Sequence, residues 1–240
     1  MPEIVVESRF RGPPTCGNGG YVAGLLARIA GGHRTVAMRL PTPLDTPLAY
    51  NTDGDAPARL VDGEKLVAEA KLADAADLPD PPAPPTLAEA EAAHATAPSY
   101  HPTCVCCGDK LDASSGLRVQ VGQLEGRPAG HLAGVWTVDP AFVGPDGLAP
   151  EEIVWAAIDC PGFYAWVAAE GRHGAMTGTM QAEVLERPRA GDRCIVLAWP
   201  IERPSERREV AGVALFSADG RLMARALQVW IRSLPRPAAA

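Results

Sequence analysis

The chain has 240 residues, of which 47% are hydrophobic and 21% charged, and its formal net charge is −7. This length suits one large domain or two of roughly 100 residues, and the composition is ordinary for a soluble globular protein. No stretch concentrates Lys and Arg, the start has neither the basic nor the apolar region of a signal peptide, and no apolar run reaches the roughly 18 residues that span a bilayer. We therefore expect a cytoplasmic protein that binds neither nucleic acid nor a membrane.

The first half is predicted to be one domain, residues 1–74. A strand over 3–9 leads into a helix with Asn18 as its N-cap, and this helix runs to about Ile29. Its apolar residues keep helical spacing, so most of the helix should be buried, and its small residues should let it lie close against a sheet. Three further strands are expected at about 34–41, 46–51 and 57–73, the last with a turn at Asp62-Gly63.

Residues 75–112 are predicted to be a linker. It begins with five prolines between positions 79 and 85, which make a stiff, extended stretch, and residues 87–94 could form a short helix. The linker ends in the Cys-rich sequence His101-Pro102-Thr103-Cys104-Val105-Cys106-Cys107-Gly108. We expect Cys104 and Cys107 to meet in a tight turn that ends at Gly108, where a positive φ is tolerated.

The cysteines of this turn raise the question of a metal. The Cys104-x-x-Cys107-Gly spacing is that of a metal knuckle, and His101 with Cys106 or Cys16 could complete a set of ligands. A structural zinc takes four ligands, usually from two such pairs, and only one pair is visible. In a reducing compartment disulfides are not expected. We therefore predict reduced thiols without metal or other cofactor, and we interpret Cys16 and Cys160 as packing residues.

Residues 113–240 repeat the order of the first half. Strands are expected at about 116–122 and 130–138, and a helix opens at Pro150, where proline and the two following acids suit a helix start. Four strands follow at about 177–187, 192–201, 207–217 and 221–232.

The two halves also align in sequence. The hairpin from Leu60 to Leu72 matches the one from Phe216 to Gln228, since each has an Asp-Gly turn followed by two apolar residues and Ala-x-Ala. Where the first copy has Ala27 and Leu72, the second has Asp159 and Gln228. The pattern predicts a pseudo-dimer with one working site, in the second half.

Asp159 is the first candidate for chemistry. It lies in an apolar helix and precedes Cys160-Pro161-Gly162, and the proline cannot donate to the Ala157 carbonyl, so the helix should break there. The break would present the carboxylate beside loosened backbone. The alternative is that Asp159 merely caps the restarted helix.

Gln228, Thr177 and Thr179 are the other candidates. Gln228 interrupts an apolar strand on the face of Ala226 and Trp230, although a place on the solvent face is the alternative. The two threonines would lie on the same side of a strand start, where threonine is common in any case. A carboxylate can act as general base for water, while a hydroxyl and a carboxamide hold that water in line. The sequence contains no Gly-x-Ser-x-Gly motif that would compete with this arrangement.

These motifs resemble those of a known family. Residues 9–73 and 116–233 are similar to the double-hotdog acyl-CoA thioesterases of type II. The opening of their N-terminal helix resembles Gly19-Gly20-Tyr21-Val22-Ala23-Gly24. Their helix segment with the catalytic aspartate resembles Ala157-Ile158-Asp159, and their strand with the catalytic glutamine resembles the strand that ends in Gln228. A count back from Pro188 places the family's hydroxyl residue at Gly178, between Thr177 and Thr179.

The resemblance implies an α+β fold, a double hotdog in which two antiparallel sheets each wrap around a long central helix. The two units would pair as a pseudo-dimer, edge to edge, into one continuous sheet around both helices. It also implies hydrolysis of an acyl-CoA or related acyl thioester by water. Asp159 would activate the water, Gln228 with Thr177 or Thr179 would position it, and backbone N–H groups at Gly19-Gly20 would bind the oxyanion. A homo-oligomer remains open.

Two other functions are compatible with such a fold. One is a non-catalytic protein that binds an acyl group or ligand, or a scaffold that uses the Cys-rich linker for contacts. The other is a hotdog dehydratase, which needs a catalytic histidine near the central helix. His33 and His173 lie at predicted helix ends but lack the expected surroundings.

Overall fold

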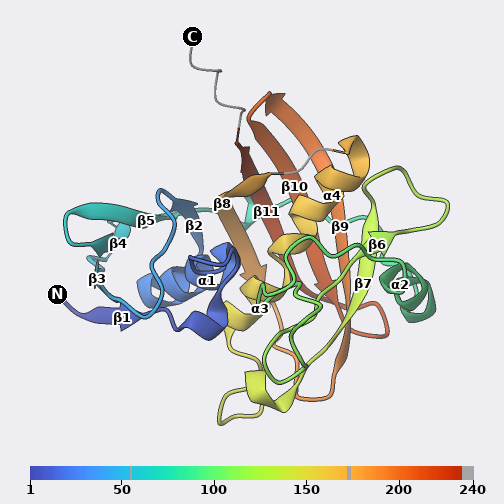
Figure 1. Ribbon diagram of the computed structural model, residues 1–240, viewed down its shortest axis with the longest axis horizontal. Helices are drawn as coiled ribbons and strands as arrows, with labels where there is room; N and C mark the ends of the chain where they lie inside the picture. Colours follow the sequence, from blue (N-terminus) through green and yellow to red (C-terminus); the bar gives the residue numbers. More distant parts are fainter. Residues whose placement is uncertain (55, 172–173, 234–240) are drawn as a thin grey trace.

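A computed structural model describes residues 1–54, 56–171 and 174–233 (Figure 1). Within these residues eleven strands form one antiparallel sheet in the order β1-β3-β4-β5-β2-β8-β11-β10-β9-β7-β6. The strands are β1 (Glu3–Val5), β2 (Arg34–Met38), β3 (Pro47–Asn51), β4 (Ala58–Asp62), β5 (Lys65–Leu72), β6 (Gly122–Gln123), β7 (Leu132–Thr137), β8 (Ala175–Val184), β9 (Arg193–Ser205), β10 (Arg208–Phe216) and β11 (Leu222–Arg232). The helices are α1 (Gly19–Ala30), α2 (Leu87–His94), α3 (Glu151–Ala157) and α4 (Cys160–Glu170), with 3-10 turns at Ser8–Phe10, Ala75–Asp77 and Pro140–Phe142.

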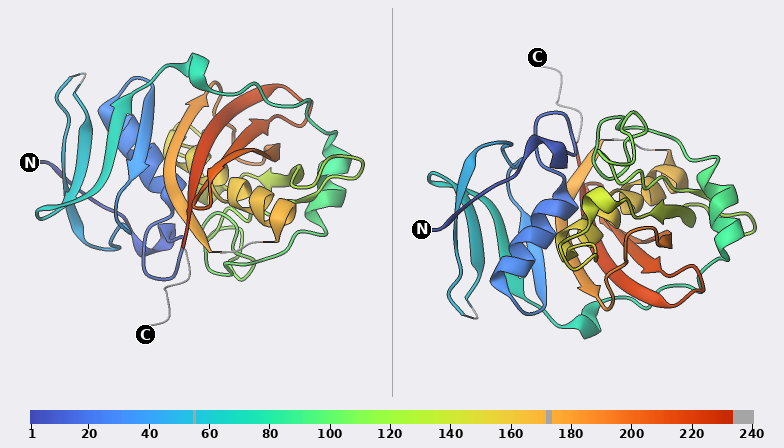
Figure 2. Two further views of the ribbon diagram at one scale, coloured as in Figure 1. Left: turned by 90° about the horizontal axis from the view of Figure 1, so that it is seen from above. Right: turned by 90° about the horizontal axis from the view of Figure 1, so that it is seen from below.

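The sheet consists of two blocks, one from each half of the chain. Strands β1 to β5 form the first block and β6 to β11 the second, and β2 pairs with β8 at the seam, where Val36 faces Met180. The two views of Figure 2 show α1 and α3–α4 together on one side of the sheet. The predicted antiparallel sheet with few helices is confirmed, and the two predicted sheets are blocks of one continuous sheet.

Helix α1 begins as predicted. Asn18 Oδ1 accepts a hydrogen bond from the Tyr21 N–H at 2.9 Å, and the helix ends at Gly31 with φ 68°. Its small residues, however, face the other central helix rather than the sheet. A Cβ at Gly24 would lie 2.7 Å from the Cβ of Trp155, so glycine is what lets α1 and α3 cross closely.

The second central helix breaks where Pro161 predicts it. Segment α3 ends at Ala157, and α4 restarts at Cys160 with the proline in its first turn, where a missing N–H costs no intrahelical bond. The long central helix that the family resemblance implies for the second half is therefore two short helices, with Ile158 and Asp159 between them.

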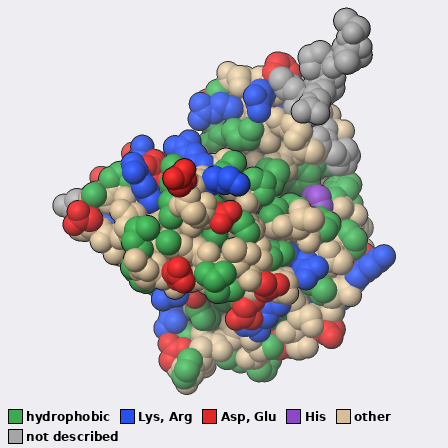
Figure 3. All heavy atoms as spheres, turned by 60° about the vertical axis from the view of Figure 1, so that its left-hand side comes forward, with side chains coloured by type: hydrophobic (Ala, Val, Ile, Leu, Met, Phe, Trp, Pro, Cys, Tyr) green, Lys and Arg blue, Asp and Glu red, His purple; other side chains and the backbone are tan. Residues whose placement is uncertain are grey.

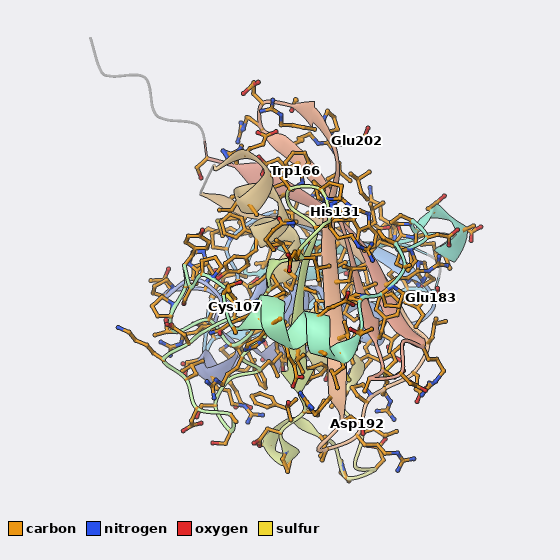
Figure 4. All side chains as sticks on the ribbon, turned by 90° about the vertical axis from the view of Figure 1, so that its right-hand side faces the viewer. Cys107, His131, Trp166, Glu183, Asp192 and Glu202 are labelled. Carbon is orange, nitrogen blue, oxygen red and sulfur yellow. The ribbon has the colours of Figure 1, made fainter. Side chains whose placement is uncertain are left out.

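The segment between the halves crosses the outer side of the sheet. Helix α2 is held at its start by a capping box between Thr86 and Glu89. Ala90 and Ala93 pack against β7 and β9 in a second, smaller core (Figure 4). The chain then turns inward, and the Cys-rich loop joins the main core, where Cys106 contacts the end of α3 and Cys107 contacts Tyr164 of α4.

Two predicted strands are much shorter than expected. Only Glu3–Val5 of residues 3–9 pairs, and Ser8–Phe10 forms a 3-10 turn. Of residues 116–122, only Gly122 enters the sheet. The N–H groups of Leu117 and Val119 donate instead to the carbonyls of Val105 and Cys106, both at 2.7 Å. This stretch therefore pairs with the Cys-rich loop, a partner that the strand-like pattern of Leu117, Val119 and Val121 does not reveal.

The surface carries both signs of charge. On the face drawn in Figure 3, Lys and Arg side chains are interspersed with Asp and Glu side chains. Among the described residues, no helix combines the length and apolar character needed to cross a membrane.

Candidate active site

Asp159 lies at the break between α3 and α4, and only 2% of its surface is exposed. Its Oδ1 accepts a hydrogen bond from Thr177 Oγ1 at 3.0 Å, and its Oδ2 accepts one from Asn18 Nδ2 at 2.9 Å. The Gly20 backbone N–H donates to the same carboxyl. Burial raises the pKa of Asp159 to about 7, although these hydrogen bonds favour the charged form. The carboxylate is thus bound by other elements, and not used as a cap of α4.

Asn18 is a site residue that the sequence indicated only as a helix cap. Its side-chain oxygen caps α1, and this leaves the Nδ2 group to bind Asp159 Oδ2. The residue is 1% exposed. A Ser, Thr or Asp at this position could cap the helix but would offer no N–H donor. The first half of the chain therefore supplies a direct partner of the carboxylate in the second half.

A β-bulge at Gly178 separates the two candidate threonines. Val229 pairs with Thr179, but the next residue of β11, Trp230, pairs with Thr177, so Gly178 is an extra residue in β8. The prediction that both threonines share a side is wrong, because the bulge turns Thr177 toward Asp159 and leaves Thr179 on the opposite face. The bulge also explains why the count from Pro188 fell on Gly178.

Gln228 is completely buried and its carboxamide is fully used. Its Nε2 donates to the carbonyl oxygens of Ile158 and Asp159 at 2.7 and 3.1 Å, and its Oε1 accepts from Trp230 Nε1 at 2.9 Å. Both carbonyls lie at the helix break, where the Asp159 carbonyl also accepts a hydrogen bond from the Gly162 N–H at 3.3 Å. Gln228 therefore holds the backbone of the break, and the alternative of a solvent-facing side chain is wrong.

Gly19 and Gly20 bring the start of α1 against this site. A Cβ at Gly19 would lie 2.5 Å from Thr177 Oγ1, and one at Gly20 would lie 2.5 Å from the Cβ of Asp159. Both positions thus require glycine for a close approach of backbone to side chain. The Gly20 N–H is used by Asp159, whereas the Gly19 N–H is one of the first-turn donors that have no acceptor within the helix.

A cavity of about 290 Å³ opens at this point between the two halves of the chain. The described residues that line it include Asn18, Gly19, Asp159 and Thr177, but neither Gln228 nor Thr179. Its apolar wall comes from both halves and includes Met38, Leu40, Phe163 and Trp230, and three arginines border it as well, Arg39, Arg207 and Arg232.

All six cysteines are buried, and four of them gather beside Asp159. The loop cysteines Cys104 and Cys107 meet in the predicted turn, in which the Gly108 N–H donates to the Cys104 carbonyl at 2.8 Å. Glycine is needed there because a Cβ would lie 2.5 Å from that carbonyl oxygen, and not because of a positive φ. Cys160, interpreted as a packing residue, joins them, with its Sγ 3.6 Å from Cys104 Sγ.

The histidines considered for a dehydratase give no support to that function. His33 Nε2 lies 3.0 Å from Gln181 Nε2 at the seam of the sheet, and it is absent from the described residues that line the cavity. His173 lies outside the described residues.

The arrangement at the cavity can hold a water molecule for deprotonation. A buried carboxylate borders an apolar cavity, its two oxygens are oriented by an amide and a hydroxyl, and a helix start contributes a backbone N–H. A carboxylate with a pKa near neutral pH is a stronger base than an exposed one.

Comparison with known proteins identifies the fold. No family model matches the sequence, and no curated protein sequence is similar to it. Among solved structures, a candidate thioesterase from Novosphingobium aromaticivorans DSM 12444 is 15% identical, with a TM-score of 0.62 over 97% of this chain and 95% of its own. The tesB protein of Mycobacterium avium subs paratuberculosis is 17% identical, with a TM-score of 0.58 over 98% of this chain and 91% of its own. The predicted likeness to thioesterase-superfamily proteins is confirmed at the level of the fold.

Proposed function

We propose that this chain, which has the fold of thioesterase-superfamily structures, hydrolyses an acyl-CoA or a related acyl thioester. The observation that carries the proposal is the Asp159 carboxylate, buried at the wall of an apolar cavity and fixed by donors from both halves. Each block of the sheet with its helix is one hotdog unit in this proposal. Residues 1–74 and 113–240 are the two units, and 75–112 is the linker.

In the proposed reaction, Asp159 takes a proton from water while the water oxygen attacks the thioester carbonyl carbon. The developing oxyanion accepts a hydrogen bond from the Gly19 N–H at the positive end of α1. Collapse of the tetrahedral intermediate breaks the C–S bond, and the proton passes from Asp159 to the leaving thiolate. The products are a carboxylic acid and a thiol.

The neighbouring residues orient this base. Thr177 and Asn18 each bind one oxygen of the carboxylate and hold it at the wall of the cavity. Gln228 acts as a positioning residue, since its amide binds the backbone of Ile158 and Asp159 and not the cavity. We assign Thr179 no part in the reaction.

The cavity suits an acyl chain followed by an anionic carrier. Its apolar wall can bury a hydrocarbon group, and Arg207 at its border can face negative charge, whereas Arg39 and Arg232 form ion pairs with Glu69 and Glu209. The first half carries Ala27 and Leu72 at the positions aligned with Asp159 and Gln228, and neither side chain can activate or orient water. We therefore propose one active site per chain.

The test compares Asp159→Asn with the parent in thioester turnover on a panel of acyl-CoAs of graded chain length. Turnover is measured as the release of the thiol. The substitution keeps the size of the side chain and removes the base, so kcat should fall by about 10²–10⁴-fold. Thr179→Val is the matched control, and its kcat should stay within about twofold of the parent.

A loss smaller than about threefold in the Asp159 variant would show that the carboxylate is not the general base. If the parent binds acyl-CoA in calorimetry but hydrolyses none of the panel, the non-catalytic binding protein becomes the better interpretation.

A further inference from the structure

The cysteine cluster beside Asp159 is built from two distant parts of the chain. Cys104 and Cys107 come from the loop that follows the proline-rich linker, and Cys160 is the first residue of α4. All three side chains are buried, and their sulfur atoms lie within 4.8 Å of one another. Cys107, labelled to the left of α2 in Figure 4, is completely buried. The hydrolysis proposed above uses none of these thiols.

The spacing of the sulfurs fits a shared metal ion. Two thiolates bound to one tetrahedral zinc at about 2.3 Å each lie about 3.8 Å apart. Cys104 Sγ and Cys160 Sγ are 3.6 Å apart, whereas a disulfide requires about 2.0 Å.

The loop has the shape of a metal knuckle without any rearrangement. The Gly108 N–H closes the turn on the Cys104 carbonyl at 2.8 Å, and the turn brings the sulfur atoms of Cys104 and Cys107 within 4.8 Å of each other. A Cβ at position 108 would collide with the turn, which explains the glycine.

Each sulfur also has an outer hydrogen-bond donor. The Tyr164 hydroxyl donates to Cys107 Sγ at 3.2 Å, and Asn18 Nδ2 lies 3.9 Å from Cys104 Sγ and 4.0 Å from Cys160 Sγ. Donors of this kind orient metal ligands and support their negative charge. A cluster of simple packing thiols has no need of two such donors in contact with all three sulfur atoms.

We propose that Cys104, Cys107 and Cys160 bind one thiophilic metal ion, zinc in the first place. Each thiol gives up its proton to solvent as its sulfur bonds to the metal, and three soft sulfurs in a compact, buried group suit Zn²⁺. The fourth position lies on the cavity side, because Cys104 and Cys160 border the cavity together with His101. A water molecule in the cavity can occupy this position.

The bound ion would tie the Cys-rich loop to the residue that directly follows Asp159. It would thereby fix the helix break from one side, while Gln228 fixes it from the other. The sequence favoured thiols without metal, because the one visible Cys pair supplies two ligands and a structural zinc takes four. It did not show that Cys160, 53 positions after Cys107, completes the group.

The experiment measures metal in the full chain, purified without a histidine tag and without chelator. Inductively coupled plasma mass spectrometry should find close to one zinc per chain. After removal of zinc, Co²⁺ should bind and give the near-ultraviolet charge-transfer band of thiolate ligands. Cys104→Ala, Cys107→Ala and Cys160→Ala should each lose the metal, whereas Cys194→Ala, at a buried cysteine in β9 outside the cluster, should keep it.

Two results would overturn the proposal. One is a parent protein that contains no zinc and gives no thiolate band with Co²⁺, a readout that needs no variant to fold. The other is a Cys160→Ala protein that is folded by circular dichroism and keeps its full zinc content. Neither readout depends on turnover, so this site stands or falls separately from the proposed hydrolysis.

Discussion

At the residue scale, the cost of burying the Asp159 carboxylate explains why several neighbours donate hydrogen bonds to it. Removing a charge from water is unfavourable unless hydrogen bonds replace the lost hydration. Here Asn18, Thr177 and the Gly20 N–H supply them. These donors leave the carboxylate in a fixed orientation at the cavity wall, and an exposed aspartate would have no such constraint.

The two threonines of β8 provide a matched pair of variants. Thr177→Val removes the hydroxyl that binds Asp159 Oδ1 and keeps the shape of the side chain. A hydrogen bond to a charged group contributes about 1.5–3 kcal/mol, so kcat should fall by about 10- to 100-fold. Thr179→Val changes a side chain on the other face of the strand, and steady-state kinetics should place it near the parent. Equal losses in both variants would contradict the bulged register.

Some of these residues could be predicted from the sequence, and others could not. Pro161 marks the helix break, and the mismatch between the two halves marks Asp159 and Gln228, because both signals are local or repeated. The second role of Asn18 could not be found this way, since its partner lies 141 residues later. The bulge at Gly178 is likewise a property of the pairing between β8 and β11.

At the scale of elements, the join between α3 and α4 depends on a strand. Gln228 in β11 binds the carbonyls of Ile158 and Asp159, and Gly162 makes room for it, since a Cβ there would lie 1.9 Å from Gln228 Oε1. The short strands β1 and β6 show the limit of pattern reading at this scale. Alternating apolar residues at 117–121 indicate burial, but the choice between the sheet and the Cys-rich loop is made by tertiary contacts.

Gln228→Met should weaken this join without emptying the space. The variant leaves the Ile158 carbonyl and the Trp230 N–H without their partners in a dry site and removes one of the two donors to the Asp159 carbonyl, which costs about 2–4 kcal/mol. Chemical denaturation should detect this loss in the free energy of unfolding. Under conditions where the variant is folded, kcat should fall while KM for the acyl-CoA changes little, because Gln228 acts through Asp159.

Val229→Thr, at the adjacent position on the opposite face of β11, is the control for this effect. Its free energy of unfolding should stay within about 0.5 kcal/mol of the parent. A Gln228→Met protein with the stability and kcat of the parent would show that the amide is not what holds the break.

At the scale of the whole molecule, the site exists only because the two halves are joined. Asn18 and Gly20 come from the first half and Asp159 and Thr177 from the second, and the cavity lies between them. The duplicated sequence predicted the pairing, since two copies of one unit can add edge to edge. It did not predict that the copy without a carboxylate supplies the donors that hold the carboxylate of the other.

The crossing of α1 and α3 offers a direct test of this dependence. Gly24→Ala would place a Cβ 2.7 Å from the Cβ of Trp155 and 2.8 Å from the Cα of Glu152, and a backbone atom cannot move aside cheaply. Overpacking of this kind costs about 1–3 kcal/mol. The helices must separate slightly, and Asn18 moves with α1, so both the free energy of unfolding and kcat should fall together.

Arg28→Ala is the matched control on the same helix, because its half-exposed side chain forms an ion pair with Glu152 and its removal adds no atom to the helix crossing. Such pairs contribute about 0–1 kcal/mol, so this variant should keep the kcat of the parent with little loss of stability. The control matters because a general weakening of α1 would affect both variants alike. A Gly24→Ala protein that loses stability but keeps full kcat would show that the position of α1 does not determine the orientation of the Asp159 carboxylate. In that case Thr177 and the backbone of the helix break orient the carboxylate without help from the first half.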